Sequence, residues 1–188
     1  MVALDRFLSR LAKSMSKAFF LLLLLVTVVF PQNKPEPLDG PDRPFHDDLL
    51  DNLQGHWKLT GTVAGHPGDA ELDAVWVLNH QFLYIHEKGA GVTRGRQYEA
   101  HVYVGYDNAS ERYVVHWIDI YGGRFSEPTG FGTRSGNTIK FNFEYPDGPF
   151  HNAFIWNPES KTWRFLLEQK NEAGKWGTFA DRTAAKVK

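Results

Sequence analysis

The fold is decided by residues 139–170, IKFNFEYPDGPFHNAFIWNPESKTWRFLLEQK, in which three short segments alternate between apolar and polar side chains. Alternation with a period of two is the pattern of a β-strand that buries one face and exposes the other. The turns between the segments, PDGP (146–149) and NPES (157–160), hold the Pro, Gly, Asn and Asp residues that favour chain reversal. The stretch therefore predicts consecutive antiparallel hairpins.

Pairing across the turns tests whether these hairpins share one inside face. The predicted register joins three sets of residues across successive turns: Tyr145 with Phe150, Trp156 with Trp163, and Gln169 with Trp176. One face then collects apolar residues: Ile139, Phe141, Phe143, Phe154, Phe165 and Leu167. Asn152 and Arg182 fall on this same inside face. Each is therefore expected either to satisfy backbone groups at a barrel end or to contact a ligand.

The same strand pattern continues along most of the chain. A short helix is expected within residues 45–55, ending at Gly55. Ten strands are expected, at roughly 56–64, 71–78, 81–88, 96–106, 112–121, 127–133, 137–145, 150–157, 162–170 and 175–185. Closing so many strands into a barrel removes the exposed edges of the sheet. The predicted fold class is all-β, a closed antiparallel up-and-down β-barrel of about ten strands, and the barrel domain spans residues 45–188.

The N-terminal residues predict export. Four basic residues precede the apolar run at 18–30, which is typical of a secretory signal and is short for a membrane-spanning helix of about 20 residues. No small-residue cleavage site follows, so residues 1–30 are either a signal peptide or an uncleaved anchor. Residues 31–44 contain five prolines and are expected to form a linker. The expected location is the periplasm, the cell envelope or the medium, with membrane contact only through the N-terminal segment.

The composition excludes several classes of function. The chain has no cysteine, which rules out disulfides, cysteine-ligated metal and thiol catalysis. The net charge of −1 favours no nucleic-acid partner. No G-x-S-x-G, S-x-x-K or P-loop motif occurs, so an enzyme is not favoured.

Three sequence features carry a family resemblance. Gly55-x-Trp57 opens the first expected strand, residues 105–122 read GYDNASERYVVHWIDIYG, and Arg182 lies in the last strand. Together they resemble an uncharacterised bacterial family with a lipocalin-like, calycin-type β-barrel and secreted members. The resemblance implies an internal pocket but no established activity. It also implies that Gly55, Trp57 and Arg182 close one barrel end, with Arg182 stacked on the Trp57 ring.

The predicted function is the binding of a small, mainly apolar molecule or lipid inside the barrel. We expect Asp119 and Asn152 to orient the ligand in a pocket lined by Trp76, Tyr98, Trp117, Asp119, Phe141, Phe143, Asn152, Phe154 and Phe165. Two alternatives remain open. Burial would raise the pKa of Asp119, which would suit an acid or base in an enzyme. The many aromatic residues could instead fill the interior of a structural or interaction protein.

Metal and cofactor sites are weakly indicated. His101 and His116 lie on neighbouring expected strands with Glu99 nearby, which makes the two histidines weak candidates for a metal site. The opposite face of these strands is more apolar, so both histidines are expected to face solvent. A heme site would need a histidine pointing inward, and none is indicated. We therefore predict no metal and no cofactor.

Overall fold

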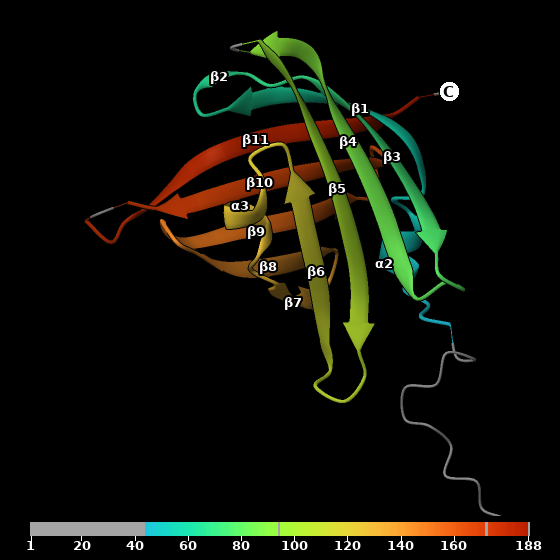
Figure 1. Cartoon of the computed structure of the whole chain (residues 1–188). Coiled ribbons are helices and arrows are strands. Elements are labelled where there is room, and N and C mark those ends of the chain that lie inside the picture. Colours follow the sequence, from blue (N-terminus) through green and yellow to red (C-terminus); the bar gives the residue numbers. More distant parts are fainter. Residues whose placement is uncertain (1–43, 94, 172, 188) are drawn as a thin grey trace, which may run out of the picture. The chain divides into compact units, whose positions relative to one another are not determined.

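The computed structural model describes residues 44–187 apart from residues 94 and 172 (Figure 1). The predicted signal or anchor at 1–30, and the predicted linker except for its last residue, lie outside the described residues. Within the described part there is no helix long and apolar enough to span a membrane.

Ten strands form a closed antiparallel barrel, which confirms the predicted fold class (Figure 1). Neighbouring strands follow the chain order, and β11 pairs with β1 to close the sheet. The short β2 pairs only with the end of β1. The bounds of the strands are β1 (Gly55–Val63), β2 (His66–Pro67), β3 (Ala70–Val77), β4 (Phe82–Thr93), β5 (Arg96–Asp107), β6 (Arg112–Asp119), β7 (Gly130–Ser135), β8 (Thr138–Tyr145), β9 (Gly148–Asn157), β10 (Thr162–Lys170) and β11 (Trp176–Lys186).

The predicted hairpin registers are confirmed in one case and corrected in two. Trp156 lies opposite Trp163, as expected. Phe150 lies opposite Phe143 rather than Tyr145, because Tyr145 already pairs with Gly148 across a two-residue turn. Gln169 lies opposite Gly177 instead of Trp176, and a bulge then shifts the pairing so that Phe165 faces Arg182. The β8–β9 slip is two residues, an even number, so the predicted inside face survives and its six apolar residues are all buried.

One end of the barrel is closed by the short helix α2 (Asp48–Asp51), which occupies only part of the predicted helix. Asp47 caps α2 by accepting hydrogen bonds from the backbone N–H groups of Leu49 and Leu50 at 3.0 and 2.8 Å. Both leucines are buried, as is Trp57, whose Nε1–H donates to the carbonyl of Leu53 at 2.7 Å. The helix and Trp57 thus plug this end with apolar side chains.

The predicted stacking of Arg182 on Trp57 is corrected by the register of the closing strands. Trp57 lies opposite Lys186, whose Nζ is 5.4 Å from the centre of the Trp57 ring. Arg182 lies opposite Gly61 and binds Glu87 instead. Gly55, the expected helix stop, is the first residue of β1.

Because Trp57 is almost fully buried, Trp57→Ala should lower the free energy of unfolding by about 3–5 kcal/mol. Urea denaturation measures the change. Trp176→Ala is the matched control, because this tryptophan is 39% exposed and its loss should cost much less. Equal losses in the two variants would show that Trp57 is not a plug.

Candidate functional site

The predicted pocket residues divide between two regions of the barrel. Phe141, Phe143, Phe154 and Phe165 are buried and pack as core, with ring centres 5.1 Å apart for Phe141 and Phe154 and 4.8 Å apart for Phe154 and Phe165. Trp76 lies at the plugged end, where its Nε1–H donates to Asp51 Oδ1 at 2.9 Å. The four phenylalanines therefore fill the barrel interior, and Trp76 helps to close the α2 end.

The other predicted pocket residues meet at the opposite end, which we call the mouth. Tyr98 of β5 donates a hydrogen bond to Asp119 Oδ2 of β6 at 3.4 Å, and Trp117 Nε1–H donates to the Tyr98 hydroxyl oxygen at 3.2 Å. All three residues occupy inward positions near the ends of adjacent strands and are only partly buried. The three side chains are therefore less deeply buried than the phenylalanines of the core.

Aromatic side chains from other strands complete the mouth. Phe150 of β9 packs edge-on against both Tyr145 and Phe179, with ring centres 5.7 and 5.4 Å apart. The helix α3 (Gly123–Ser126) follows β6 and is joined to the β8–β9 turn by an ion pair of Arg124 with Asp147 at 2.8 Å (Figure 1). The mouth is thus lined mainly by aromatic side chains and carries a few polar atoms.

A charged pair crosses the barrel interior close to the mouth. Arg182 of β11 binds Glu87 of β4 through two contacts, Nη1 to Oε1 at 2.5 Å and Nη2 to Oε2 at 3.0 Å. Both side chains are buried, and Arg182 Nε has no hydrogen-bond partner among the described residues. Sequence reasoning missed Glu87, although alternation from Leu83 and Ile85 places it inside. A buried pair costs desolvation, so its retention needs a reason beyond stability.

The polar atoms of the mouth have shifted pKa values. Burial raises the pKa of Asp119, and the nearby negative charge of Glu87 adds to the shift. Burial also raises the pKa of Tyr98 well above its usual value, followed by the negative charges of Glu87 and Asp119. Burial and then Asp119 raise the pKa of Tyr145 to about 12. Both tyrosines are therefore neutral hydrogen-bond donors at physiological pH.

Asn152 is the second inward polar residue that the sequence predicted. It lies opposite Phe141 and Leu167 and is 2% exposed. Its Oδ1 has no hydrogen-bond partner within the described part of the chain. Asn152 therefore sits in the packed region with Phe141, and it neither satisfies a described backbone group through Oδ1 nor lines the mouth depression.

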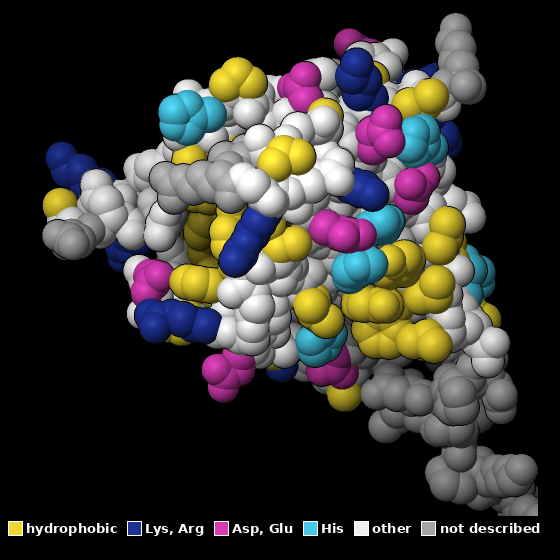
Figure 2. Space-filling model, turned by 45° about the horizontal axis from the view of Figure 1, so that its top comes forward, with side chains coloured by type: hydrophobic (Ala, Val, Ile, Leu, Met, Phe, Trp, Pro, Cys, Tyr) yellow, Lys and Arg dark blue, Asp and Glu magenta, His cyan; other side chains and the backbone are white. Residues whose placement is uncertain are grey.

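An open depression of about 570 Å³ lies at the rim of the mouth. Its walls come from β1–β2, β8–β9 and β10–β11, with Ala64, Pro149, Lys170 and Phe179 among its lining residues. Figure 2 shows a hollow on this side of the barrel, with hydrophobic side chains inside it and Lys and Arg side chains around it. The volume lies within the range of about 300–1,000 Å³ for small-molecule sites. Tyr98, Trp117 and Asp119 are not among the residues that line this depression.

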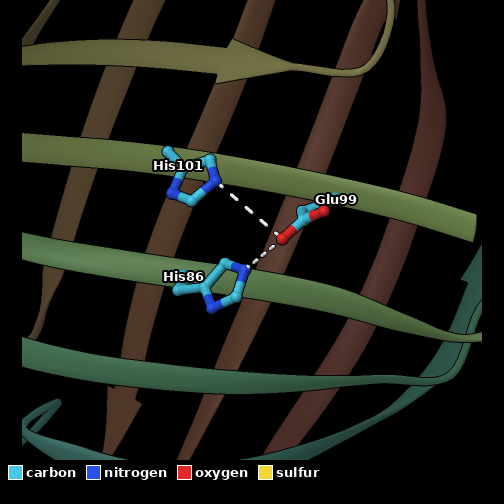
Figure 3. Close-up of side chains that lie close together, drawn as sticks. All are labelled: His86, Glu99 and His101. Carbon is cyan, nitrogen blue, oxygen red and sulfur yellow. Dashed lines mark hydrogen bonds and ion pairs between the residues drawn. The ribbon is translucent and has the colours of Figure 1, made fainter.

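A cluster of metal-ligating groups lies outside the barrel and not at the mouth. His86, Glu99 and His101 bring their ligand atoms within 4.8 Å of one another (Figure 3). The predicted neighbour of His101, His116, lies opposite Tyr103 and lines a separate depression of about 250 Å³. His101 therefore lies in this cluster and His116 does not, because the β4–β5 pairing places His86 opposite His101.

The fold and the site define a class, a closed antiparallel barrel with a plugged end and a polar, aromatic mouth. The family model described as "Protein of unknown function (DUF1579)" matches residues 44–184, and the chain belongs to this family. A solved structure, Rv2717c from M. tuberculosis, is 12% identical with a TM-score of 0.49, over 74% of this chain and 95% of that one. The comparison with curated proteins finds no match.

The Glu87–Arg182 pair gives a prediction about stability. Glu87→Gln should lower the free energy of unfolding by about 3–5 kcal/mol, because it leaves the Arg182 charge buried without its counter-charge. Replacing both residues, Glu87→Leu with Arg182→Met, should recover most of that loss, as measured by urea denaturation. The control is Arg164→Ala, which breaks the exposed pair with Asp181 and should cost about 1 kcal/mol or less. A harmless Glu87→Gln would contradict this account.

Asp119 gives a prediction about pH. Its folded pKa is raised above 3.8, so folding favours the protonated form, and this contribution is lost as pH rises through the folded pKa. Asp119→Asn should therefore be more stable than the wild type at neutral pH, with the gain vanishing below pH 3.8. Urea denaturation at a series of pH values measures it.

Asp181→Asn is the matched control for this pH series, and its stability should change with pH in the opposite direction. The hydrogen bond from Arg164 holds the pKa of Asp181 below its usual value. That carboxylate therefore stabilises the fold above its unfolded pKa and ceases to do so in acid. Asp181→Asn should lose stability at neutral pH. An Asp119→Asn curve parallel to that of Asp181→Asn would refute the assignment.

Proposed function

We propose that this protein binds a small molecule with an apolar body and a hydrogen-bonding group, held at the mouth of the barrel. One observation carries the proposal. Polar and charged groups gather at one end of an apolar interior, with an open depression of about 570 Å³ at its rim, while the other end is plugged. Recesses of this kind, mainly apolar with a few converging polar groups, are the usual form of a ligand site.

The chemistry of the mouth defines the ligand further. Tyr145 presents a neutral hydroxyl donor, whereas the Tyr98 hydroxyl already donates to Asp119, and the buried Arg182 Nε–H has no partner among the described residues. Phe150 and Phe179 offer flat apolar surfaces beside them. A lipid or another apolar molecule with one hydrogen-bond acceptor, such as a carbonyl or hydroxyl oxygen, fits this arrangement.

A second candidate function is supported by Asp119. Its raised pKa and its contact with the Tyr98 hydroxyl are properties of a general acid or base acting on the same kind of molecule. Turnover of a bound molecule, lost in Asp119→Asn while binding persists, would distinguish an enzyme from a binding protein.

We also propose that the protein is exported. The basic residues ahead of the apolar run at 18–30 support this, with cleavage or anchoring as the two possibilities. Native mass spectrometry of the full chain purified from its own envelope tests both proposals at once. The intact mass shows whether residues 1–30 are removed, and an added mass reveals a ligand that co-purifies.

Tyr145→Phe is the sharpest test of the mouth, because it removes one hydroxyl donor without creating a cavity. With medium-chain alcohols and fatty acids as probes, we expect the dissociation constant of the best probe to rise about tenfold, the value of one hydrogen bond of about 1.5 kcal/mol. Titration calorimetry measures it. Tyr103→Phe is the control, since it is the same change on the outer face of β5, away from the mouth.

Two results would contradict the proposal. One is the absence of any co-purified mass together with no binding of any probe. The other is equal probe binding in wild type, Tyr145→Phe and Tyr103→Phe, which would place the binding site away from the mouth.

A further inference from the structure

The outer face of the β4–β5 hairpin holds two histidines and a carboxylate in close contact (Figure 3). His86 of β4 lies directly opposite His101 of β5, and their rings stack with centres 4.8 Å apart and planes 10° apart. Glu99 lies two residues before His101, on the same face by strand alternation. Its Oε1 is 2.7 Å from His86 Nε2 and 3.9 Å from His101 Nε2. Three ligand atoms from two strands thus converge on one point.

A fourth residue orients one of these rings. The hydroxyl of Tyr84 is hydrogen-bonded to His101 Nδ1 at 2.5 Å, and the two rings stack with centres 5.8 Å apart. With Nδ1 occupied, His101 has only Nε2 free to coordinate, and this atom faces Glu99. Metal-binding histidines in proteins characteristically use one ring nitrogen for the metal and the other for such a hydrogen bond.

The ligand set selects the kind of ion. Two imidazoles and one carboxylate suit zinc and similar divalent transition metals, whereas calcium and magnesium prefer oxygen ligands only. Zinc–nitrogen bonds of about 2.0–2.1 Å in a tetrahedron place neighbouring ligand atoms about 3.3 Å apart. The observed 2.7 and 3.9 Å lie on either side of that value, and all three ligand atoms lie within 4.8 Å of one another. Because an imidazole binds a metal in the plane of its ring, the two stacked rings would turn relative to each other when the ion binds.

The exposure of the cluster leaves room for a further ligand. The side chains of His86, Glu99 and His101 are 31%, 42% and 44% exposed. Figure 2 shows histidine side chains beside acidic ones on this face of the barrel. A metal held by three protein ligands at such a surface keeps one position open for water or another molecule.

We propose that His86, Glu99 and His101 bind one divalent transition-metal ion of the zinc class, with Tyr84 as the residue that positions His101. The site lies on the outer surface of the sheet and uses no residue of the mouth. It is therefore independent of the ligand-binding function proposed above, and either can fail without the other.

Zinc binding to the full chain tests the proposal directly. After removal of metal with a chelator, titration calorimetry with ZnCl2 should show one ion per chain, and MgCl2 should show no binding. Tyr84→Phe removes the hydrogen-bond partner of His101 and should raise the dissociation constant for zinc about 10–100-fold. Glu99→Gln and His86→Gln each remove a metal ligand and should raise it at least as much. With CoCl2, the wild type should show the visible absorption of a four-coordinate cobalt site, and Glu99→Gln should lose it.

The chain offers matched controls for the histidines. His116→Gln changes an exposed histidine of the neighbouring strand β6, and His66→Gln changes one in β2, so both should bind zinc like the wild type. Circular dichroism confirms that each variant is folded, which is expected because the altered side chains are partly exposed. Zinc binding that is equally strong in His86→Gln and the wild type would overturn the proposal. So would a wild type that takes up no zinc at about 100 μM, a concentration that saturates sites of micromolar affinity.

Discussion

The pairing of β11 with β1 is the constraint on which the rest of the structure depends. Seven residue pairs, from Trp57 with Lys186 to Val63 with Ala180, turn an open sheet into a cylinder with no free long edge. Closure places every alternate residue inside the barrel. The enclosed space must be filled by side chains or by a bound molecule. Near α2 the interior is filled by Trp57 and its neighbours. Any binding is thereby directed to the mouth.

Closure also explains why a charged pair stands inside the barrel. Glu87 and Arg182 come from β4 and β11, which are not neighbours in the sheet, so their contact spans the interior. Packed apolar residues lie on one side of the pair and the partly exposed Tyr98 lies on the other. Hydrophobic replacements of buried pairs are often as stable, so a fixed charge here makes better sense as a means of orienting a polar group. The unpartnered Nε of Arg182 agrees with that role.

Alternation in the sequence is enough to predict the barrel and its inside face, because the β8–β9 register error is of two residues and leaves each side chain on its face. Turn lengths and bulges are harder to predict from the sequence, so Phe150 and Gln169 were given the wrong partners. Contacts between strands distant in the sequence, such as Glu87 with Arg182, need the closed geometry. The Arg182–Trp57 stacking came from a family pattern, and the closing register places Arg182 opposite Gly61 instead.

The β4–β5 hairpin contributes residues to both proposed sites, one on each face. His86 points outward and its neighbour Glu87 points inward, and the same holds for Glu99 and Tyr98. A slip of one residue in β4 would turn His86 into the core and Glu87 into water. The same slip in β5 would turn Glu99 into the core and Tyr98 into water. The bulge between Lys88 and Val92 lies beside both sites, where the strand pairing shifts. The register of this hairpin is therefore a single requirement shared by the polar mouth and the histidine cluster.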